Sequence, residues 1–175
     1  MSQFIEVIKS RKSIRRWLGK KVPRNLVKEV IECGMAAPSA FSSHPFNLIA
    51  IDDKKKIQGL LKDRLQLKSP PYWINSTKWA KKSGLENYEK LKNPPLLIIV
   101  TGNLKKCPDV PSMIQTLAAS SENVLLACHA LRLGACWLYV YDPDLPETES
   151  NVRIILDLSK DFLILSMIAI GYPKI

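Results

Sequence analysis

Basic side chains and one hydroxyl alternate in the stretch RKSIRRW, residues 11–17. Arg11, Ser13 and Arg15 occupy every second position, so in an extended chain their side chains point to the same side. A phosphate monoester needs several charge-assisted donors that converge on it, and forked guanidinium groups with a hydroxyl provide such donors. The spacing therefore suits an anion clamp. A solvated surface turn with scattered ion pairs is the alternative that spacing alone leaves open.

Two other segments combine small residues with free backbone amides. The proline turn APSA, residues 37–40, could pack along a flat ligand. The segment LGACWLYV, residues 133–140, joins an expected helix to an expected strand, so its amides could face the edge of a cofactor. Both patterns also occur at ordinary helix ends, and Cys136 and Trp137 are residue types that more often lie in a core.

Familiar catalytic motifs are absent from the sequence. It has no GxGxxG turn and no Walker loop. Its four cysteines form no CxxC pair, and its two histidines, His44 and His129, are far apart, so neither a zinc site nor a Ser-His-Asp triad can be drawn. His129 falls inside an expected helix, where a hydrogen-bonded structural histidine is the favoured interpretation. We expect no metal and no dedicated catalytic side chain, because a cofactor would carry the chemistry.

Length and composition indicate one globular domain over residues 1–175, with 46% hydrophobic residues and a net charge of +10. Residues 1–24 hold eight basic side chains and one acidic side chain, which raises the possibility of an anionic partner. Lysines without a nucleic-acid motif are weak evidence for DNA or RNA binding. Isolated thiols predict a reducing, cytoplasmic setting. No signal peptide and no run of about eighteen apolar residues are found, so no membrane association is expected.

Apolar periodicity predicts the elements that hold these segments. Helices are expected over 2–9, 23–33, 54–65 and 111–132, with Gly34 and Gly134 as helix stops and Ser2 as the first cap. A last helix begins in DLPETESNVRIILDL, residues 144–158, where Asp144 and Glu147 have the spacing of a capping pair.

Strands are expected over 46–52, 96–102, 135–141 and 162–173. The run 96–102 is too apolar for an edge strand and is placed centrally. Residues 68–95 are the least regular part, and Tyr72, Trp73 and Trp79 there could line a pocket or attach the segment to the core. The order of elements predicts an α+β domain with helices around a mostly buried sheet.

Taken in order, these segments resemble the nitroreductase family of FMN-dependent oxidoreductases. VIKSRKSIRRW resembles the first helix of the family and its Arg-x-Ser-x-Arg element, and ECGMAAPSAFSSHPFNLIAIDD resembles its Ala-Pro-Ser turn and the following strand. NPPLLIIVTG, SSENVLLACHALRLGACWLYVYD and MIAIGYP match its later core. The resemblance covers nearly the whole chain except residues 60–93, which in this family form a variable, lid-like segment.

The resemblance implies a central mixed, mainly antiparallel sheet flanked by helices, and a homodimer that holds FMN at the subunit interface. It also implies ping-pong hydride transfer from NADH or NADPH through flavin N5 to a small-molecule acceptor such as a nitroaromatic or a quinone. Dehalogenation, ene reduction and flavin reduction on the same scaffold remain alternatives. A nucleic-acid-binding module is a further alternative of a different class.

By the same resemblance, three groups of residues bind the cofactor. Arg11, Lys12, Ser13 and Arg15 would hold its phosphate and ribityl end, while Pro38, Ser39 and Ala40 would flank the ring from the other protomer, and Cys136, Trp137 and Leu138 would run past the ring. The turn of the family commonly continues Asn-x-Gln-Pro-Trp, so His44 stands here at the glutamine position. Many members carry a basic residue in a C-terminal tail that also binds the phosphate. Either Lys174 takes that role here or FMN is held more loosely.

Overall fold

The sheet at the centre of the fold is antiparallel throughout its four strands. This computed structural model describes residues 3–65, 91, 93–143 and 146–174. The strand order is β1-β2-β4-β3, with every neighbouring pair antiparallel. The sole parallel contact among the described bridges joins Ser13 to Ala135. The strands are β1 Phe46–Ile51, β2 Leu96–Asn103, β3 Gly134–Tyr139 and β4 Phe162–Gly171.

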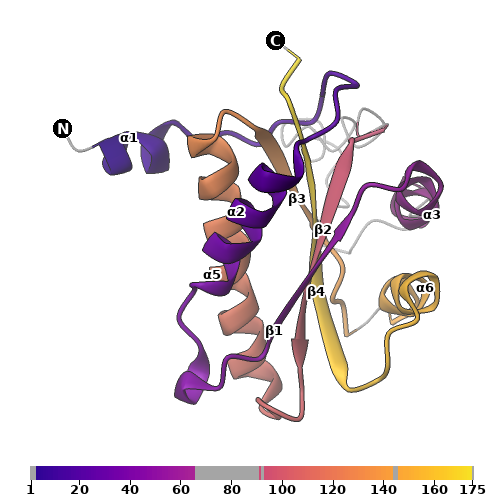
Figure 1. Cartoon of the computed structure of the whole chain (residues 1–175). Helices are drawn as coiled ribbons and strands as arrows, with labels where there is room; N and C mark the ends of the chain where they lie inside the picture. The colour runs from indigo at the N-terminus through magenta and orange to yellow at the C-terminus, as the bar shows by residue number, and fades with distance from the viewer. Residues whose placement is uncertain (1–2, 66–90, 92, 144–145, 175) are drawn as a thin grey trace, which may run out of the picture.

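Helices cover both faces of this sheet (Figure 1). The long helix α5, Val110–Ala130, packs against β2, β3 and β4, and α2, Arg24–Met35, packs on α5 and β1. On the other face α3, Lys54–Leu65, pairs with α6, Glu147–Leu156. The predicted α+β class, with a mainly antiparallel sheet between helices, is therefore confirmed. In the part of the chain that the structure describes, no helix is long and apolar enough to cross a membrane.

The central strands are buried on both faces, as the apolar run at 96–102 predicted. Ile98 and Val100 of β2 point into the core beneath α2 and α5, whereas Leu97 and Ile99 point into the core beneath α3 and α6. Alternate residues of a strand face opposite sides, so an apolar run with no polar break is what a sheet covered on both faces requires.

Two glycines predicted to stop helices serve close packing instead. Gly34 lies inside α2, where an added Cβ would come within 2.7 Å of side-chain carbons of Leu48 and Val124. Helix α5 ends at Ala130, and Gly134 is the first residue of β3. The sequence suggested stops because glycine commonly ends helices, whereas here its missing side chain admits a neighbouring segment.

Several boundaries and exposures also differ from expectation. Helix α1 runs over Gln3–Ser10, and its apolar residues Phe4, Ile5 and Ile8 are exposed, with Phe4 at 63%. Strand β3 lies at the edge of the described sheet, where Tyr139 is exposed. Helix α6 begins after Pro146, which provides no side-chain cap, and the predicted capping pair involves residue 144, outside the described residues. The predicted cap Ser2, residue 144 and the aromatic residues 72, 73 and 79 lie outside the described residues.

Candidate functional site

The clamp segment, residues 11–17, is an extended strand-like link rather than a helix or a free turn. Ser13 forms a parallel bridge with Ala135 at the start of β3. The Ile14 backbone N–H donates a 2.9 Å hydrogen bond to the Ala135 carbonyl. Because the chain is extended and bonded to the sheet edge, alternate side chains are directed to opposite sides, as the spacing predicted.

Farther along, the clamp segment is fastened to the end of β4. Trp17 forms an antiparallel bridge with Pro173, and the Leu18 N–H donates to the Tyr172 carbonyl at 2.8 Å. The Trp17 indole N–H also donates to the Gly134 carbonyl at 3.0 Å. Figure 1 shows this link at the upper end of the sheet, where β3 begins and β4 ends. The backbone of the clamp therefore has many partners that do not involve its charged groups.

The two arginines of the expected clamp face, Arg11 and Arg15, both act on the pKa of the Cys136 thiol. Each guanidinium charge favours the thiolate and so opposes the effect of burial on that pKa. The Arg15 Nε is buried without a hydrogen-bond partner, while the Arg11 Nε lies 3.5 Å from a carboxylate oxygen of Glu122. A buried donor without a partner is rare in folded proteins. These two side chains therefore fit an anionic or acceptor-rich group such as the phosphate and ribityl end of FMN.

Cys136 itself is not a nucleophile. Burial is the largest influence and raises the pKa of its thiol, although Arg15 and Arg11 act in the opposite direction. The thiol therefore stays protonated near neutral pH, and a protonated thiol is a poor nucleophile. Its position under the clamp agrees with the interpretation of Cys136 as a small core residue.

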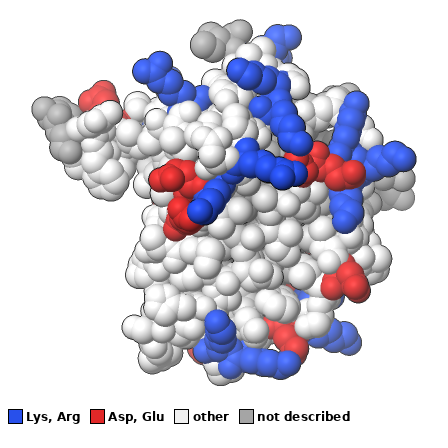
Figure 2. All heavy atoms as spheres, in the orientation of Figure 1, with Lys and Arg blue, Asp and Glu red and all other residues white. Residues whose placement is uncertain are grey.

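The other basic residues of this region are directed to solvent or to the other side of the link. Lys12 is exposed, and so is Ser13 of the expected clamp face. The Lys174 backbone N–H donates to the Arg16 carbonyl at 3.0 Å, which places Lys174 directly opposite Arg16. Opposed residues of an antiparallel pair share one side, so Lys174 lies on the side of Arg16 rather than that of Trp17. Figure 2 shows Lys and Arg side chains gathered at this end of the molecule.

The residues of β3 do not all face the clamp. Cys136 and Leu138 belong to the core beneath α3 and α6, whereas Trp137 packs into the core beneath α2 and α5. β3 is the last strand of the described sheet, so the backbone groups of its outer edge do not pair with another strand of that sheet. The side chains of Cys136, Trp137 and Leu138 do not share one face of the sheet. A ligand that contacts all three residues would therefore also contact the backbone at the outer edge of β3.

The second predicted group lies in the site turn, residues 38–44, which contains the short 3₁₀ helix Ala40–Ser42 (η1). The Ala40 N–H donates to the Thr116 hydroxyl at 3.1 Å, and the His44 N–H donates to the Ser39 hydroxyl at 3.1 Å. Phe41, Ser42 and His44 have left-handed backbones, with φ of 54°, 51° and 42°. This turn is thus held by side chains against a strained backbone.

The clamp segment and the site turn lie at opposite ends of the sheet. The Pro45 carbonyl accepts from the N–H of Asn103, the last residue of β2, whereas the clamp pairs with the far end of β4. A rise of about 3.3 Å per residue puts the two ends of β4 roughly 30 Å apart. Figure 1 also shows the two segments at opposite ends of the sheet. Within one chain, the clamp segment and the site turn therefore do not meet.

One polar residue of α5 beside the clamp, Glu122, was not found by sequence reasoning. Glu122 pairs with Arg11, and the Ser10 hydroxyl lies 2.9 Å from the His129 Nε2. The latter contact agrees with the interpretation of His129 as a hydrogen-bonded structural histidine. Acidic residues within helices are common, so nothing in the sequence indicated that Glu122 pairs with Arg11, which lies 111 residues away.

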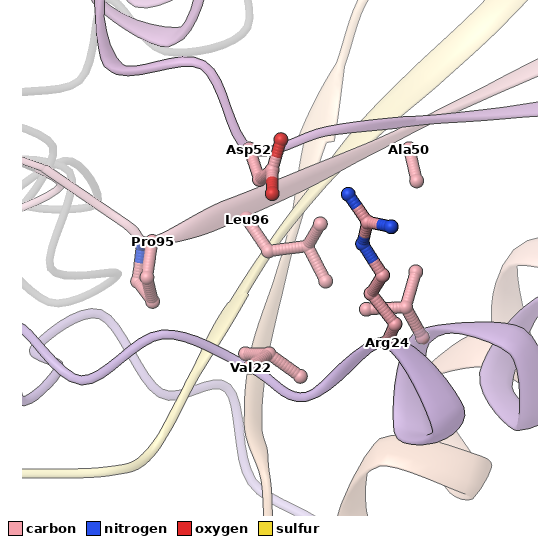
Figure 3. A pocket seen from close by; sticks show the side chains of 7 residues that line it. Val22, Arg24, Ala50, Asp52, Pro95 and Leu96 are labelled. Atoms are coloured by element: carbon pink, nitrogen blue, oxygen red, sulfur yellow. The ribbon is translucent and has the colours of Figure 1, made fainter.

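A cavity of about 200 Å³ lies beside β1 and the beginning of α2 (Figure 3). Arg24 and Asp52 are on its rim, and the Asp52 carboxylate pairs with Lys21 at 2.8 Å. That ion pair lowers the pKa of Asp52. No motif of the sequence pointed to this cavity, and none of the predicted site residues lines it. Its lining residues are Val22, Arg24, Val27, Ala50, Asp52, Pro95 and Leu96.

A model of the nitroreductase family matches residues 8–172 of the chain, which includes the clamp segment, the site turn and all four strands. The chain belongs to the nitroreductase family. It is 28% identical over 171 residues to a Methanothermobacter thermautotrophicus protein, covering 97% of this chain and 76% of the relative. That protein carries the provisional name NADH dehydrogenase/NAD(P)H nitroreductase.

Solved structures show the same fold. A Parabacteroides distasonis structure with the same provisional name is 27% identical, with a TM-score of 0.80 and coverage of 100% of this chain and 89% of that one. A Desulfovibrio desulfuricans nitroreductase solved in complex with FMN has a TM-score of 0.76 at 22% identity, covering 100% of this chain and 88% of that one. The predicted family membership and fold of this chain are thereby confirmed.

Proposed function

We propose that this member of the nitroreductase family is an FMN-dependent NAD(P)H oxidoreductase. The observation that carries the proposal is the unpartnered, buried Arg15 Nε beside Arg11, in a segment that the family model includes. The FMN in the related Desulfovibrio structure and the NAD(P)H in the names of relatives support the same cofactor and reductant. When bound, FMN supplies two-electron hydride transfer from the reduced nicotinamide, by a ping-pong scheme, to acceptors such as nitroaromatics or quinones.

The protein would bind and orient the cofactor rather than donate or accept protons. Arg15 and Arg11 would hold the phosphate and ribityl end through charge-assisted hydrogen bonds. The Glu122 carboxylate would orient Arg11 and would also neutralise part of the positive charge of Arg11. The exposed Ser13 hydroxyl and the Lys12 backbone are further donors on the same link. No general acid or base is required from this set, because the redox chemistry belongs to the cofactor.

We further propose that the site is completed in a homodimer. The clamp segment of one protomer would meet the site turn, Pro38–Ala40 and His44, of the other, since the two lie at opposite ends of one chain. The outer edge of β3, including the backbone of residues 136–138, would run beside the flavin ring. Exposed apolar side chains on α1, namely Phe4, Ile5 and Ile8, favour a second copy as the partner that covers them.

A visible absorption spectrum of the purified protein, followed by titration with FMN, tests the proposal most directly. Flavin bands in the protein as isolated, or saturable uptake of FMN, are expected. A protein without flavin bands that takes up no FMN would overturn the assignment. Size-exclusion chromatography with light scattering checks the dimer in the same sample.

The identity of the acceptor is a separate question. Steady-state oxidation of NADH and of NADPH with a nitroaromatic, a quinone and an enone separates nitroreductase activity from the other reductive reactions that the scaffold could support. We expect turnover with the nitroaromatic or the quinone. Turnover confined to the enone or to free flavin would replace the proposed reaction but leave FMN binding intact.

A further inference from the structure

Helix α1 leads directly into the clamp segment, so its attachment sets the position of Arg11. None of its residues, Gln3–Ser10, is fully buried, and Phe4 is 63% exposed. Burial therefore contributes little to holding this helix on its own chain. α1 packs against α5, and a polar contact between the two helices lies at Ser10, the last residue of α1.

The contact between Ser10 and His129 has a defined direction. A serine hydroxyl has one proton to donate, and the Ser10 hydroxyl donates it to the Glu6 carbonyl at 2.7 Å. The 2.9 Å contact to the His129 Nε2 must then be donated by the ring, which carries a proton on that nitrogen. Ser10 is therefore not activated as a nucleophile, because the imidazole donates to its hydroxyl rather than accepting from it. The contact attaches the end of α1 to α5.

Helix α5 holds two consecutive residues of this junction from one side. Glu122 and His129 are seven residues apart, which puts them two turns from each other on the same side of the helix. Glu122 lies 3.5 Å from the Arg11 Nε, while His129 holds Ser10. Because the ion pair uses Nε, the four N–H bonds of the terminal guanidinium nitrogens can still meet a phosphate. His129 thus fixes the backbone from which Arg11 extends, and Glu122 fixes the direction of its side chain.

We propose that His129 is a positioning residue for the phosphate of the cofactor, and that it acts through Ser10 on Arg11. This inference rests on the proposed function, FMN binding at the clamp. It adds to the site a residue that lies 118 positions beyond Arg11 in the sequence, and it implies that a flavin without a phosphate does not depend on His129. Helix α5 is a fixed support, because its neighbouring residues Val124 and Cys128 are buried in the core.

The test compares FMN with riboflavin, which has the same ring and ribityl chain but no phosphate. Dissociation constants for both flavins are measured by fluorescence titration of the whole chain without bound flavin, and Tm is measured on the same samples. His129→Leu and Ser10→Ala each remove the hydrogen bond from one side, whereas His129→Gln keeps an N–H donor. Asn123→Leu is the matched control, because it removes a different hydrogen bond of α5, at 3.1 Å to the Cys33 carbonyl.

We expect His129→Leu and Ser10→Ala to weaken FMN binding roughly two- to tenfold, the range of one hydrogen bond, with riboflavin binding unchanged. His129→Gln should restore the FMN affinity. Asn123→Leu should lower Tm without changing the ratio of the two dissociation constants. In an Arg11→Met background, His129→Leu should cause no further loss, because its effect passes through that guanidinium.

Equal losses for FMN and riboflavin would overturn the inference, since His129 would then serve the fold alone. Unchanged FMN affinity in His129→Leu and Ser10→Ala would also overturn it, as would an equal change of the ratio in Asn123→Leu or a full loss from His129→Leu in the Arg11→Met background. If His129→Leu does not fold, Ser10→Ala at the exposed end of α1 gives the same comparison. Absence of FMN binding in the unmodified protein would instead overturn the proposed function itself.

Discussion

The clamp segment and the site turn are held in place in different ways. Residues 11–17 are fixed by backbone pairing to β3 and β4, so their positions do not depend on their charged groups. Residues 38–44 have few such partners and depend on single side chains, Thr116 and Ser39, to hold a left-handed backbone. The first region presents the unpartnered Arg15 Nε, and the second presents the exposed ring of Phe41.

This difference indicates how each region will respond to mutation. A sheet edge can hold a buried donor such as the Arg15 Nε without a partner, because the rest of the segment is anchored independently. Charge can therefore be removed from the clamp without disturbing the fold. In the turn, one hydroxyl carries much of the anchoring, so small changes alter geometry and stability together.

The largest effect is expected from Arg15→Met. Loss of charge-assisted hydrogen bonds, each worth about 1.5–3 kcal/mol, should weaken FMN binding by roughly 10- to 100-fold. Arg11→Met should weaken it less, because Glu122 already engages that guanidinium. Fluorescence titration with FMN measures both, and Lys55→Met on the exposed surface of α3 is the control. A result in which all three variants bind FMN equally would remove the clamp from the site.

Gly134→Ala tests whether backbone packing positions the clamp. The new Cβ would come within 2.7 Å of the Ile14 Cβ, a contact that requires the link to shift. Overpacking of this kind should lower the free energy of unfolding by about 1–3 kcal/mol and weaken FMN binding as well. Gly19→Ala is the matched control, since nothing lies within 4 Å of its added Cβ. Thermal unfolding that leaves the two variants equally stable would contradict close packing at Gly134.

Thr116→Val should have a smaller effect, confined to the turn. The substitution keeps the shape of the side chain and removes the acceptor of the Ala40 N–H, which should cost about 1 kcal/mol of unfolding free energy. For a chain of this size we expect a fall in Tm of about 2–4 °C. Differential scanning calorimetry measures it, with Gln115→Ala on the exposed side of α5 as control. An unchanged Tm would show that Thr116 does not anchor the turn.

Ser42→Gly should have the smallest effect and the opposite sign. Glycine adopts the left-handed backbone at φ 51° without the penalty that a Cβ brings, although it also adds freedom to the unfolded chain. The balance should raise the free energy of unfolding by about 0.5 kcal/mol, which chemical denaturation can detect. A lower stability would mean that the serine side chain contributes contacts that outweigh backbone strain.

Sequence patterns gave correct predictions where the periodicity of a short segment reflects its surroundings in the folded protein. The apolar run at 96–102 placed β2 at the centre of the sheet, and the alternation of Arg11, Ser13 and Arg15 agrees with the extended link that the structure shows. They failed at Gly34 and Gly134, because glycine can end a helix or admit a close neighbour, and only the neighbour distinguishes these uses. They also gave no sign of the Thr116 anchor, whose hydroxyl meets a backbone 76 residues away.

For this member of the nitroreductase family, residue types and their order were sufficient to predict the family, the α+β class and which residues carry charge. These properties depend on local periodicity and on motifs read along the chain. Tertiary structure was needed to show that Arg15 is buried without a partner for its Nε, that Arg11 is paired, and that the clamp and the turn lie at opposite ends of the sheet. These properties depend on contacts between residues that are distant in sequence. A pattern within a short segment contains no information about such contacts.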